Sequence, residues 1–432
     1  MQTNFSIAQL TDPNIEAAND ILRKCVHCGF CTATCPTFVL KGDELDSPRG
    51  RIYLMKEAFE SGGPATPKLA KHLDRCLSCL SCMTTCPASV DYMHLVDYGR
   101  TFVAETHKRP IADAGLRWLL ARVLPSPDIF RLSLIGAWLG RPFRNLMPAR
   151  LKAMLELAPD RINSPSSVDS PGVFRADGET RMRVALLSGC AQQVLRPSIN
   201  ESTVRLLNRL GCEVVIADKM GCCGALVHHM GLEEQGHDAA KRNIAAWEAA
   251  EQTHGAIDAV VINASGCGTT VKDYGWMLRH DSQWAARARV ISEKTRDVSE
   301  VLLQLGLTGL TGEARPKIAY HSACSMQHGQ QLKTEPVDLL RAAGFEVVQP
   351  AESHLCCGSA GTYNIMQPEW AAELGARKAA HLKALGADCI ATGNIGCLTQ
   401  ISASMEGENT PPVLHTVELL DWVTGGPRPD SI

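Results

Sequence analysis

The sequence predicts an α+β multidomain protein, in which a helical N-terminal domain is followed by two small α/β domains that duplicate one another. Three observations favour this organisation. A chain of 432 residues is too long for one hydrophobic core, since single cores rarely grow past about 250 residues. Eight of the 18 cysteines lie in two dense runs before residue 90. A repeated pattern of apolar runs, helical stretches and cysteines begins near residue 184.

The overall composition is ordinary for a soluble globular protein, with 45% hydrophobic and 21% charged residues. The 43 basic and 46 acidic residues give a net charge of −3, which argues against a polyanion-binding protein such as a nucleic-acid binder. No stretch reaches the ~18 consecutive apolar residues of a membrane-spanning helix. The first twenty residues lack the apolar core of a secretory signal, so metal ligation explains the cysteines better than disulfides do.

Composition and cysteine spacing divide the chain into five parts. Residues 1–108 form the cysteine-rich helical domain, and residues 109–158 form a helical segment without cysteine. Residues 159–183 are rich in proline, serine and charge, which predicts an exposed linker. The two repeated domains follow at residues 184–310 and 311–432.

The repeated domains share both local sequence and spacing. Each has a strand-like run that ends in cysteine, then a Cys-Cys-Gly segment, then a second run that ends in cysteine. These cysteines are Cys190, Cys222, Cys223 and Cys267 in the first copy, and Cys324, Cys356, Cys357 and Cys397 in the second. The first cysteine and the adjacent pair are 32 residues apart in both copies, which indicates a duplication.

Each copy alternates short apolar runs with helical patterns. In the first copy, Val184–Leu187, Val214–Ala217 and Ala259–Ile262 are predicted to be buried parallel strands, with crossover helices over Ser198–Leu210 and Glu233–Ala250. The cysteines come just after predicted strands. Because ligands of parallel sheets collect at the carboxyl ends of strands, we expect the four cysteines of a copy to converge.

Two runs of the form C-x₂-C-x₂-C-x₃-C-P are the strongest chemical signal in the chain, and they end at Pro36 and Pro87. This spacing is typical of ferredoxins that hold two 4Fe–4S clusters. Three closely spaced thiolates bind three irons on one face of a cubane. The fourth thiolate is too far away along the chain to complete the same site, so it ligates the other cluster. The predicted ligands are Cys25, Cys28, Cys31 and Cys86 for one cluster, and Cys76, Cys79, Cys82 and Cys35 for the other.

Zinc and haem account poorly for these two runs. Structural zinc does not require three evenly spaced cysteines followed by proline. Covalent haem attachment needs a histidine after C-x-x-C, where this chain has Gly29 and Leu80. About forty residues separate the runs and show helical spacing, which favours a helical form of the ferredoxin domain. In this insertion Arg49 and Arg51 either face the negative charge of a cluster or a partner subunit, or lie at a solvated helix start.

The repeated domains resemble the cysteine-rich domains of heterodisulfide reductases, and the whole arrangement resembles the iron–sulfur subunit of bacterial glycolate oxidase. Ser47–Ile52 (SPRGRI), Thr392–Cys397 (TGNIGC) and His415–Trp422 (HTVELLDW) add to the second resemblance. It implies an electron-transfer subunit of a flavin-dependent glycolate, or 2-hydroxy-acid, dehydrogenase. Such a subunit relays electrons from separate flavoprotein (FAD) subunits to a quinone-type acceptor. Alternatives are the corresponding subunits of glycerol-3-phosphate or lactate dehydrogenase, or a heterodisulfide-reductase-like subunit.

The heterodisulfide-reductase pattern is incomplete. Its modules end in C-x-x-C, but Ala264 and Asn394 stand where the first of those cysteines would be. This loss argues against disulfide-reductase chemistry and against that family's noncubane cluster. Three interpretations of the eight remaining cysteines, as candidate additional metal ligands, stay open: a further iron–sulfur cluster, structural zinc, or metal-free thiols.

Other cysteines and histidines near these motifs are predicted to be structural. Cys212 and Cys389 lie beside predicted strands and are interpreted as small buried hydrophobic residues. Five histidines are expected to have satisfied polar or surface roles instead of binding metal; they are His228, His229, His321, His328 and His354.

No nucleotide or substrate site is visible. The chain has no G-x-G-x-x-G after a strand, no phosphate-binding loop and no Ser-His-Asp signature, so no flavin and no catalytic residue are predicted on it. Clusters transfer one electron at a time, whereas oxidation of an alcohol removes two. A flavin on another subunit is therefore expected to split the pair.

The segment from residue 111 to residue 152 bears on the location of the acceptor. It has seven basic and two acidic residues among many Trp, Leu and Phe side chains. Such a helix either lies on an anionic membrane surface or packs against the ferredoxin domain or a partner subunit. The expected location is the cytoplasm, with peripheral attachment to the cytoplasmic face of the inner membrane as an option.

Overall fold

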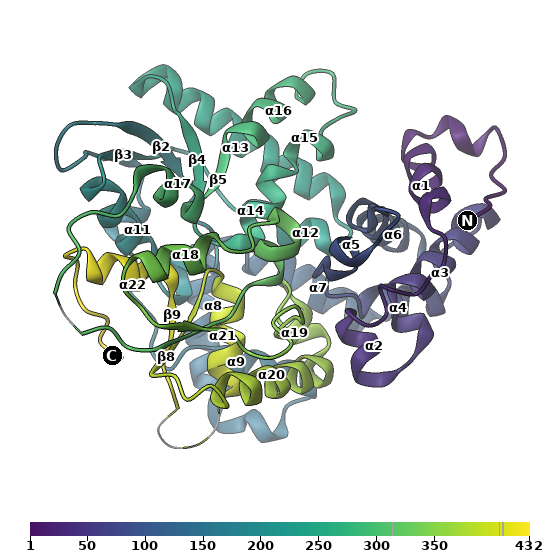
Figure 1. The fold of residues 1–432 in the computed structure, drawn as a ribbon. Coiled ribbons are helices and arrows are strands. Elements are labelled where there is room, and N and C mark those ends of the chain that lie inside the picture. Colours follow the sequence, from purple (N-terminus) through teal and green to yellow (C-terminus); the bar gives the residue numbers. More distant parts are fainter. Residues whose placement is uncertain (313, 406, 408–409) are drawn as a thin grey trace.

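The computed structural model describes residues 1–312, 314–405, 407 and 410–432, and it places a helical N-terminal domain beside two α/β domains (Figure 1). The N-terminal helices are η1 (Gln9–Thr11), α1 (Pro13–Lys24), α2 (Pro36–Lys41), η2 (Glu44–Asp46), α3 (Pro48–Ser61), α4 (Pro67–Asp74), α5 (Ser81–Thr85) and α6 (Tyr92–Thr106). The helices α1 to α4 all begin with proline, whose fixed φ suits the first helical position. Asp12, Ser47 and Thr66 accept backbone hydrogen bonds at the starts of α1, α3 and α4.

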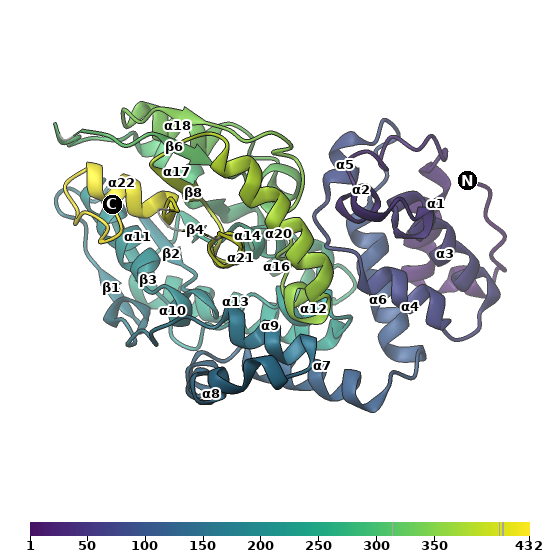
Figure 2. The ribbon, with the colours of Figure 1, turned by 90° about the horizontal axis from the view of Figure 1, so that it is seen from below.

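A helical segment connects this domain to the rest of the chain. It consists of α7 (Ile111–Val123), α8 (Pro127–Gly140), η3 (Arg141–Leu146) and α9 (Ala149–Leu157). Figure 2 shows these helices along one side of the molecule. One face of the segment packs on both α/β domains, since α8 contacts α10 and α9 contacts α19, α20 and α21.

The first α/β domain, here called module one, contains a five-stranded sheet in the order β1-β3-β2-β4-β5. Its strands are β1 (Gly172–Phe174), β2 (Met182–Leu186), β3 (Cys212–Ile216), β4 (Ala259–Ile262) and β5 (Thr295–Asp297). Its helices are η4 (Ser167–Asp169), α10 (Gln192–Leu195), α11 (Ser198–Arg209), α12 (Ala225–His229), α13 (Glu233–His254), α14 (Ser265–Lys272), α15 (Tyr274–Met277), α16 (Ala285–Lys294) and α17 (Val298–Leu305). Only β1 is antiparallel, and it comes from the stretch predicted to be a linker.

The second α/β domain, module two, contains a parallel sheet in the order β7-β6-β8-β9. Its strands are β6 (Ile318–Tyr320), β7 (Val347–Val348), β8 (Cys389–Thr392) and β9 (Val413–His415). Its helices are the π-helical turn η5 (Ser325–Gln330), α18 (Glu335–Ala342), α19 (Tyr363–Met366), α20 (Pro368–Lys383), α21 (Ile395–Ser404) and α22 (Thr416–Val423).

The two modules have the same topology. Counted along the chain from β2 and from β6, the parallel strands of each sheet follow the order second, first, third, fourth. The fold class predicted from the repeated cysteine pattern is therefore confirmed. The predicted strands of module one differ from β2, β3 and β4 by at most two residues at either end. Cys212 and Cys389 lie within β3 and β8 and are fully buried, as predicted.

The modules share one hydrophobic core and are joined by ion pairs. The helix α11 of module one packs on α22 of module two, and α17 packs on α18. Arg205 and Arg209 of α11 both pair with the buried carboxylate of Asp421 in α22. The modules therefore form one continuous body beside the N-terminal domain.

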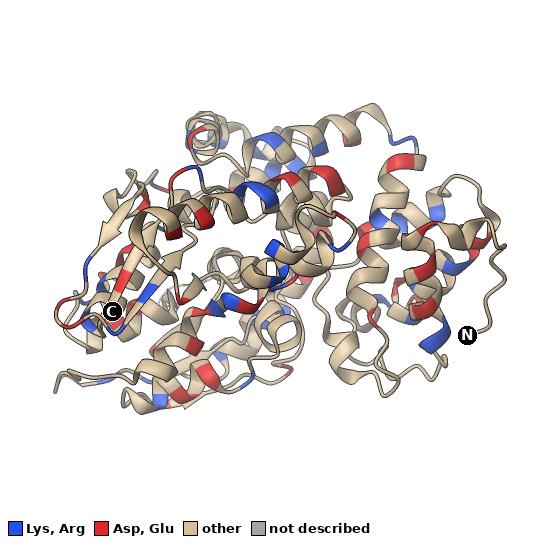
Figure 3. Cartoon of the chain, turned by 90° about the horizontal axis from the view of Figure 1, so that it is seen from above, with Lys and Arg blue, Asp and Glu red and all other residues tan. Residues whose placement is uncertain are grey.

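Acidic and basic residues are mixed over most helices (Figure 3), as the near-neutral net charge predicts. Within the described residues, no helix combines the length and the apolar character that crossing a bilayer requires.

Candidate functional site

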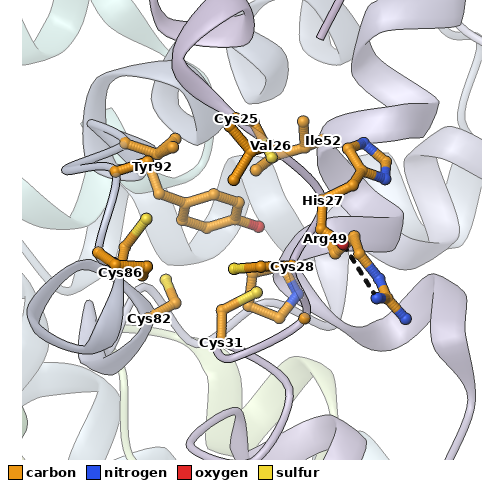
Figure 4. Close-up of a pocket in the computed structure, with 15 residues that line it drawn as sticks. Cys25, Val26, His27, Cys28, Cys31, Arg49, Ile52, Cys82, Cys86 and Tyr92 are labelled. Atoms are coloured by element: carbon orange, nitrogen blue, oxygen red, sulfur yellow. Dashed lines mark hydrogen bonds between the residues drawn. The ribbon is translucent and has the colours of Figure 1, made fainter.

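The first N-terminal cysteine run and the last cysteine of the second run meet in one pocket. It has about 450 Å³ of space and lies between the end of α1 and the loop after α5 (Figure 4). Ile52, Arg49 and the ring of Tyr92 also line it. The structure therefore brings together all four predicted ligands of one cluster, namely Cys25, Cys28, Cys31 and Cys86.

The other four cysteines line a second pocket of about 310 Å³. These are Cys35, Cys76, Cys79 and Cys82. The two pockets share a wall, because Pro48, Cys82 and Tyr92 line both of them. The Tyr92 hydroxyl lies 3.7 Å from the sulfur of Cys76 and donates to it. Nothing in the sequence around Tyr92 predicted this contact.

The backbone between the cysteines adopts the same unusual conformation in both runs. His27 and Ser78, each before the second cysteine, have φ values of 57° and 48°. Gly29 and Leu80, each after that cysteine, have φ values of 83° and 60°. Loops that alternate left- and right-handed residues turn successive N–H groups inward and form anion-binding concavities, which recur at iron–sulfur sites. Positive φ at residues other than glycine is costly and clusters at functional sites.

A buried cation lies beside the second pocket. The Arg51 side chain is 1% exposed, and its guanidinium lies 3.8 Å from the sulfur of Cys35 and donates to Thr37 at 3.1 Å. Burial alone would lower the pKa of Arg51, but the nearby Cys76 and Cys35 thiols and Asp46 raise it, so the guanidinium stays charged. This burial excludes the interpretation of Arg51 as part of a solvated helix start.

Asp46 fixes Arg51 in this position. Its fully buried carboxylate lies 3.5 Å from Arg51, 2.7 Å from His72 Nδ1 and 2.8 Å from Arg75. By contrast, Arg49 lies at the rim of the first pocket, where it pairs with Glu44 at 2.7 Å and donates to the carbonyl of His27. Each of the two arginines thus stands beside a different pocket.

Three of the thiols in these pockets are poor acids as bare groups. Burial raises the pKa of Cys31 to about 11, and burial also raises the pKa of Cys79 and Cys82 well above the usual range. Thiols of this kind become thiolates when a metal ion supplies the compensating charge. The four predicted cysteines in each pocket, the positive φ values between them and the buried Arg51 beside the second pocket fit 4Fe–4S clusters.

The cysteines of module one also converge. Cys222 lies within interaction distance of Cys190 and Cys223, and Cys223 lies next to Cys267. The hydroxyl of Tyr274 donates to the carbonyl of Cys223 at 2.8 Å. The predicted convergence at the carboxyl ends of the strands therefore holds for this module.

Two of the cysteines of module two, Cys324 and Cys356, lie against the ferredoxin-like N-terminal domain. The sulfurs of Cys324 and Cys356 are 3.8 Å apart, and both side chains pack in one buried cluster with Cys79 of the second pocket. The neighbouring contacts between domains are the hydrogen bond of Thr84 with His328 at 2.8 Å and Arg75 stacked on Trp370. Of the two N-terminal pockets, it is thus the second that lies next to cysteines of module two.

Most of the histidines near the motifs have the polar roles predicted for them. His228 and His229 lie 3.5 and 3.3 Å from Asp97 of α6, and His328 bonds to Thr84 and to the carbonyl of His354. His321 is the exception. It is buried, neither ring nitrogen has a partner among the described residues, and it lies beside Cys357 and Cys397.

Comparison with protein families finds matches over three stretches of the chain. Residues 21–90 match the family described as 4Fe-4S dicluster domain. Residues 184–272 and 318–402 each match the family described as Cysteine-rich domain. The two matches to one family agree with the duplication inferred from the cysteine spacing.

Comparison with whole proteins gives similarity over nearly the full length. The chain is 41% identical to the glycolate oxidase iron-sulfur subunit of Escherichia coli over 98% of both chains. It is 32% identical to the probable glycolate oxidase iron-sulfur subunit of Bacillus subtilis over 93% of both. Lactate utilization protein A of Geobacillus is 26% identical over 56% of this chain and 99% of its own length.

Comparison with solved structures also finds similarity in fold. A hypothetical protein from Helicobacter pylori superposes with a TM-score of 0.55 at 10% identity, covering 98% of this chain and 74% of that one. This similarity bears on the fold alone.

Proposed function

The chain belongs to the family of glycolate oxidase iron–sulfur subunits, and we propose that it relays electrons from a flavoprotein subunit of a glycolate dehydrogenase complex to a quinone-type acceptor at the membrane. Membership of this family makes it an iron–sulfur component of an oxidoreductase. The flavoprotein partner, the acceptor and the eight individual ligands are the proposed part.

The observation that supports this function best is the pair of adjoining pockets. Each is lined by the four cysteines predicted for its cluster, and Cys82 and Tyr92, which line both pockets, stand between them. A 4Fe–4S cluster bound in each pocket would accept and release single electrons. The chain's own residues hold the two sites a side chain apart, and they bury all four cysteines of the second pocket, which keeps water from that site.

The buried side chains around the second pocket set its electrostatics. Arg51 places a permanent positive charge within 3.8 Å of Cys35, and hydrogen bonds and charges near the sulfurs are what tune cluster potentials. The first pocket has Cys28 exposed and Arg49 at its rim, so it is the more accessible of the two. We propose that electrons from the flavoprotein enter on that side.

An exposed apolar face on the helical segment supports contact with a membrane surface. Its members lie on α7, α8 and η3 and are at least 42% exposed; they are Ile111, Trp118, Leu119, Ile129, Leu132, Ile135, Trp138, Leu139, Phe143 and Leu146. Exposed Arg122 and Arg144 lie among them, and no acidic residue is described within 4 Å of either. Apolar and aromatic side chains with interspersed arginine favour an anionic lipid surface.

The alternative interpretation, that these residues pack on the ferredoxin-like domain, does not apply to the exposed face. A partner subunit is the other candidate to cover this face. Binding of the isolated chain to lipid vesicles distinguishes a membrane surface from a partner subunit.

A glycolate-dependent assay tests the relay. The native complex, isolated with this chain, should reduce an artificial electron acceptor when glycolate is added. Replacement of this chain by Cys79→Ser should abolish that reduction while the flavoprotein still binds. Full activity with the variant would contradict the proposal. Lactate is the substrate to compare, because the lactate utilization relatives match the chain over 56% of its length.

A further inference from the structure

Arg100 of α6 makes two hydrogen bonds to the loop between the first two cysteines of the second run. Its guanidinium donates to the hydroxyl of Ser78 at 2.5 Å and to the carbonyl of Cys76 at 2.6 Å. The side chain is 10% exposed, so water competes little for these donors. Because a guanidinium is a planar fork of donors, it can make both bonds at once and hold the loop in one conformation.

The loop needs a constraint of this kind. Ser78 has a φ of 48°, a left-handed conformation that is costly for a residue other than glycine. Such a conformation persists only where the surrounding contacts over-determine it. Cys76 and Cys79 stand on either side of Ser78, and both line the second pocket. Arg100 therefore acts on two predicted cluster ligands through the backbone between them.

The first cysteine run has a different support. His27 is the equivalent of Ser78 in that run, and its carbonyl accepts a hydrogen bond from Arg49 at 3.4 Å. Arg49 is 31% exposed and pairs with Glu44 of the same domain. The support of the first loop is therefore local, whereas the ion-pair partner of Arg100 leads to another domain.

That partner is Asp97, which lies where α6 meets module one. Its carboxylate is 8% exposed and lies 3.7 Å from Arg100, 3.5 Å from His228 Nε2 and 3.3 Å from His229 Nδ1. Burial alone would raise the pKa of Asp97, but the two histidines lower it well below its usual range, so the carboxylate stays charged. Both histidines belong to α12, which begins two residues after Cys223.

The backbones of the two domains also touch at this point. Gly231, just after α12, has a φ of 82°, and a Cβ at this position would overlap the carbonyl oxygen of Arg100. Only glycine fits there, because the atom in the way is backbone and cannot turn aside. Module one therefore contacts Arg100 by direct packing as well as through Asp97.

We propose that Arg100 is a positioning residue for the cluster of the second pocket, and that Asp97 links it to module one. The inference rests on the proposed relay, since it concerns a cluster that carries the electrons. Arg100 fixes the loop from Cys76 to Cys79 and adds a largely buried positive charge, and both effects tune the potential of a cluster. Module one thus influences the second pocket whatever its own cysteines bind.

Redox titration of the full-length chain, prepared anaerobically and followed by electron paramagnetic resonance, tests the positioning role. Arg100→Gln should change the shape of the second-cluster signal and lower its potential, and leave the first-cluster signal unchanged. Arg100→Lys keeps the charge, but an ammonium group cannot reproduce the fork of two bonds. Its potential should therefore fall less, while its signal is still altered. Loss of the second signal alone, with about four irons left per chain, would also support the proposal.

The matched control is Arg131→Gln. Arg131 is 15% exposed and likewise donates to a backbone carbonyl, that of Gln193, but it lies on α8 and lines neither N-terminal pocket. This variant should keep both signals and both potentials. If Arg100→Gln behaves like this control, or if Arg100→Lys behaves like the unmodified protein, Arg100 does not position the loop.

A double-mutant cycle tests whether Arg100 acts through Ser78. Ser78→Ala should reproduce part of the change in the second-cluster signal, and adding it to Arg100→Gln should change the signal little further, because the shared bond is already gone. Fully additive changes would show that the two residues act independently and would overturn the proposal.

The link to module one is tested by Asp97→Asn and by replacing His228 and His229 together with leucine. Both variants should alter the second-cluster signal in the same direction as Arg100→Gln and keep about eight irons per chain. An unchanged second-cluster signal in both would refute the link. Dithionite reduces the clusters directly in these measurements. A failure of glycolate to reduce two otherwise normal clusters would therefore count against the relay and not against the role of Arg100.

Discussion

His94 Nε2 lies 2.9 Å from the carboxylate of Asp273, and this contact ties α6 of the ferredoxin-like domain to module one. The other ring nitrogen faces Asp91 at 2.5 Å, and the ring stacks on Trp276 with centroids 4.0 Å apart. Burial alone would lower the pKa of His94, but hydrogen bonds to Asp273 and Asp91 raise it to about 9. His94 is therefore a charged clamp between the domains at neutral pH.

The clamp predicts a dependence of stability on pH. Because the folded pKa lies above the unfolded value of about 6.5, the stabilisation is full below pH ~6.5 and is lost as the pH rises through about 9. Burial raises the pKa of Asp273, which means that burying its carboxylate costs free energy. This cost offsets part of the stabilisation that the contact with His94 provides. The net contribution is on the order of 1 kcal/mol. Anaerobic thermal unfolding should show His94→Gln less stable than the parent at pH 6.5 and equal to it near pH 10; an unchanged difference at both values would contradict the clamp.

The crossed arrangement of ligands predicts which cysteine variants behave alike. Cys25→Ser and Cys86→Ser should remove the same paramagnetic signal, and Cys35→Ser and Cys76→Ser should remove the other, since each pair lines one pocket. Electron paramagnetic resonance of the reduced protein gives the comparison. Cys212→Ala, a buried cysteine of β3, should keep both signals. Identical losses from Cys25→Ser and Cys35→Ser would refute the pairing.

The arginine beside the second pocket predicts a shift in potential. Arg51→Gln removes a buried positive charge 3.8 Å from Cys35, so the cluster there should become harder to reduce, by roughly tens of millivolts. A redox titration followed by paramagnetic resonance measures this change. The control is Arg49→Gln at the rim of the first pocket, where the side chain is 31% exposed and solvent screens its charge. An equal shift from both variants would show that burial of Arg51 is irrelevant.

The exposed apolar face predicts binding to lipid. The chain should sediment with vesicles that contain anionic phospholipid, less at high salt, and poorly with neutral vesicles. Replacing Trp118 and Trp138 by serine should reduce the bound fraction several-fold without changing the iron content. The control is Tyr53→Ser, because Tyr53 is an exposed aromatic residue of α3 and lies outside this face. Phe130 of α8 is unsuitable because it is buried. If the double tryptophan variant and Tyr53→Ser bind the vesicles equally well, a partner subunit is the better explanation of this face.

The sequence was informative where chemistry is local and uninformative where contacts come from the tertiary structure. Spacing alone predicted that Cys25 and Cys86 would share a pocket, because a cubane restricts the spacing of its ligands. The strand runs of module one were found because buried parallel strands are continuous and apolar. His321 and Cys397 follow different strands and meet only in the folded chain. The sequence therefore supplied no signal that they lie side by side. Arg51 was ambiguous for the same reason, since its burial depends on Asp46 and His72 from other elements.

Each N-terminal pocket draws cysteines from both halves of its domain, with Cys86 completing the first and Cys35 completing the second. Neither half is therefore an independent unit of assembly. During synthesis, the second site stays incomplete until residue 82 has emerged from the ribosome and the first until residue 86, so both sites close late and nearly together. A cut between α3 and α4 would consequently disable both sites at once, so it should release iron from both sites together.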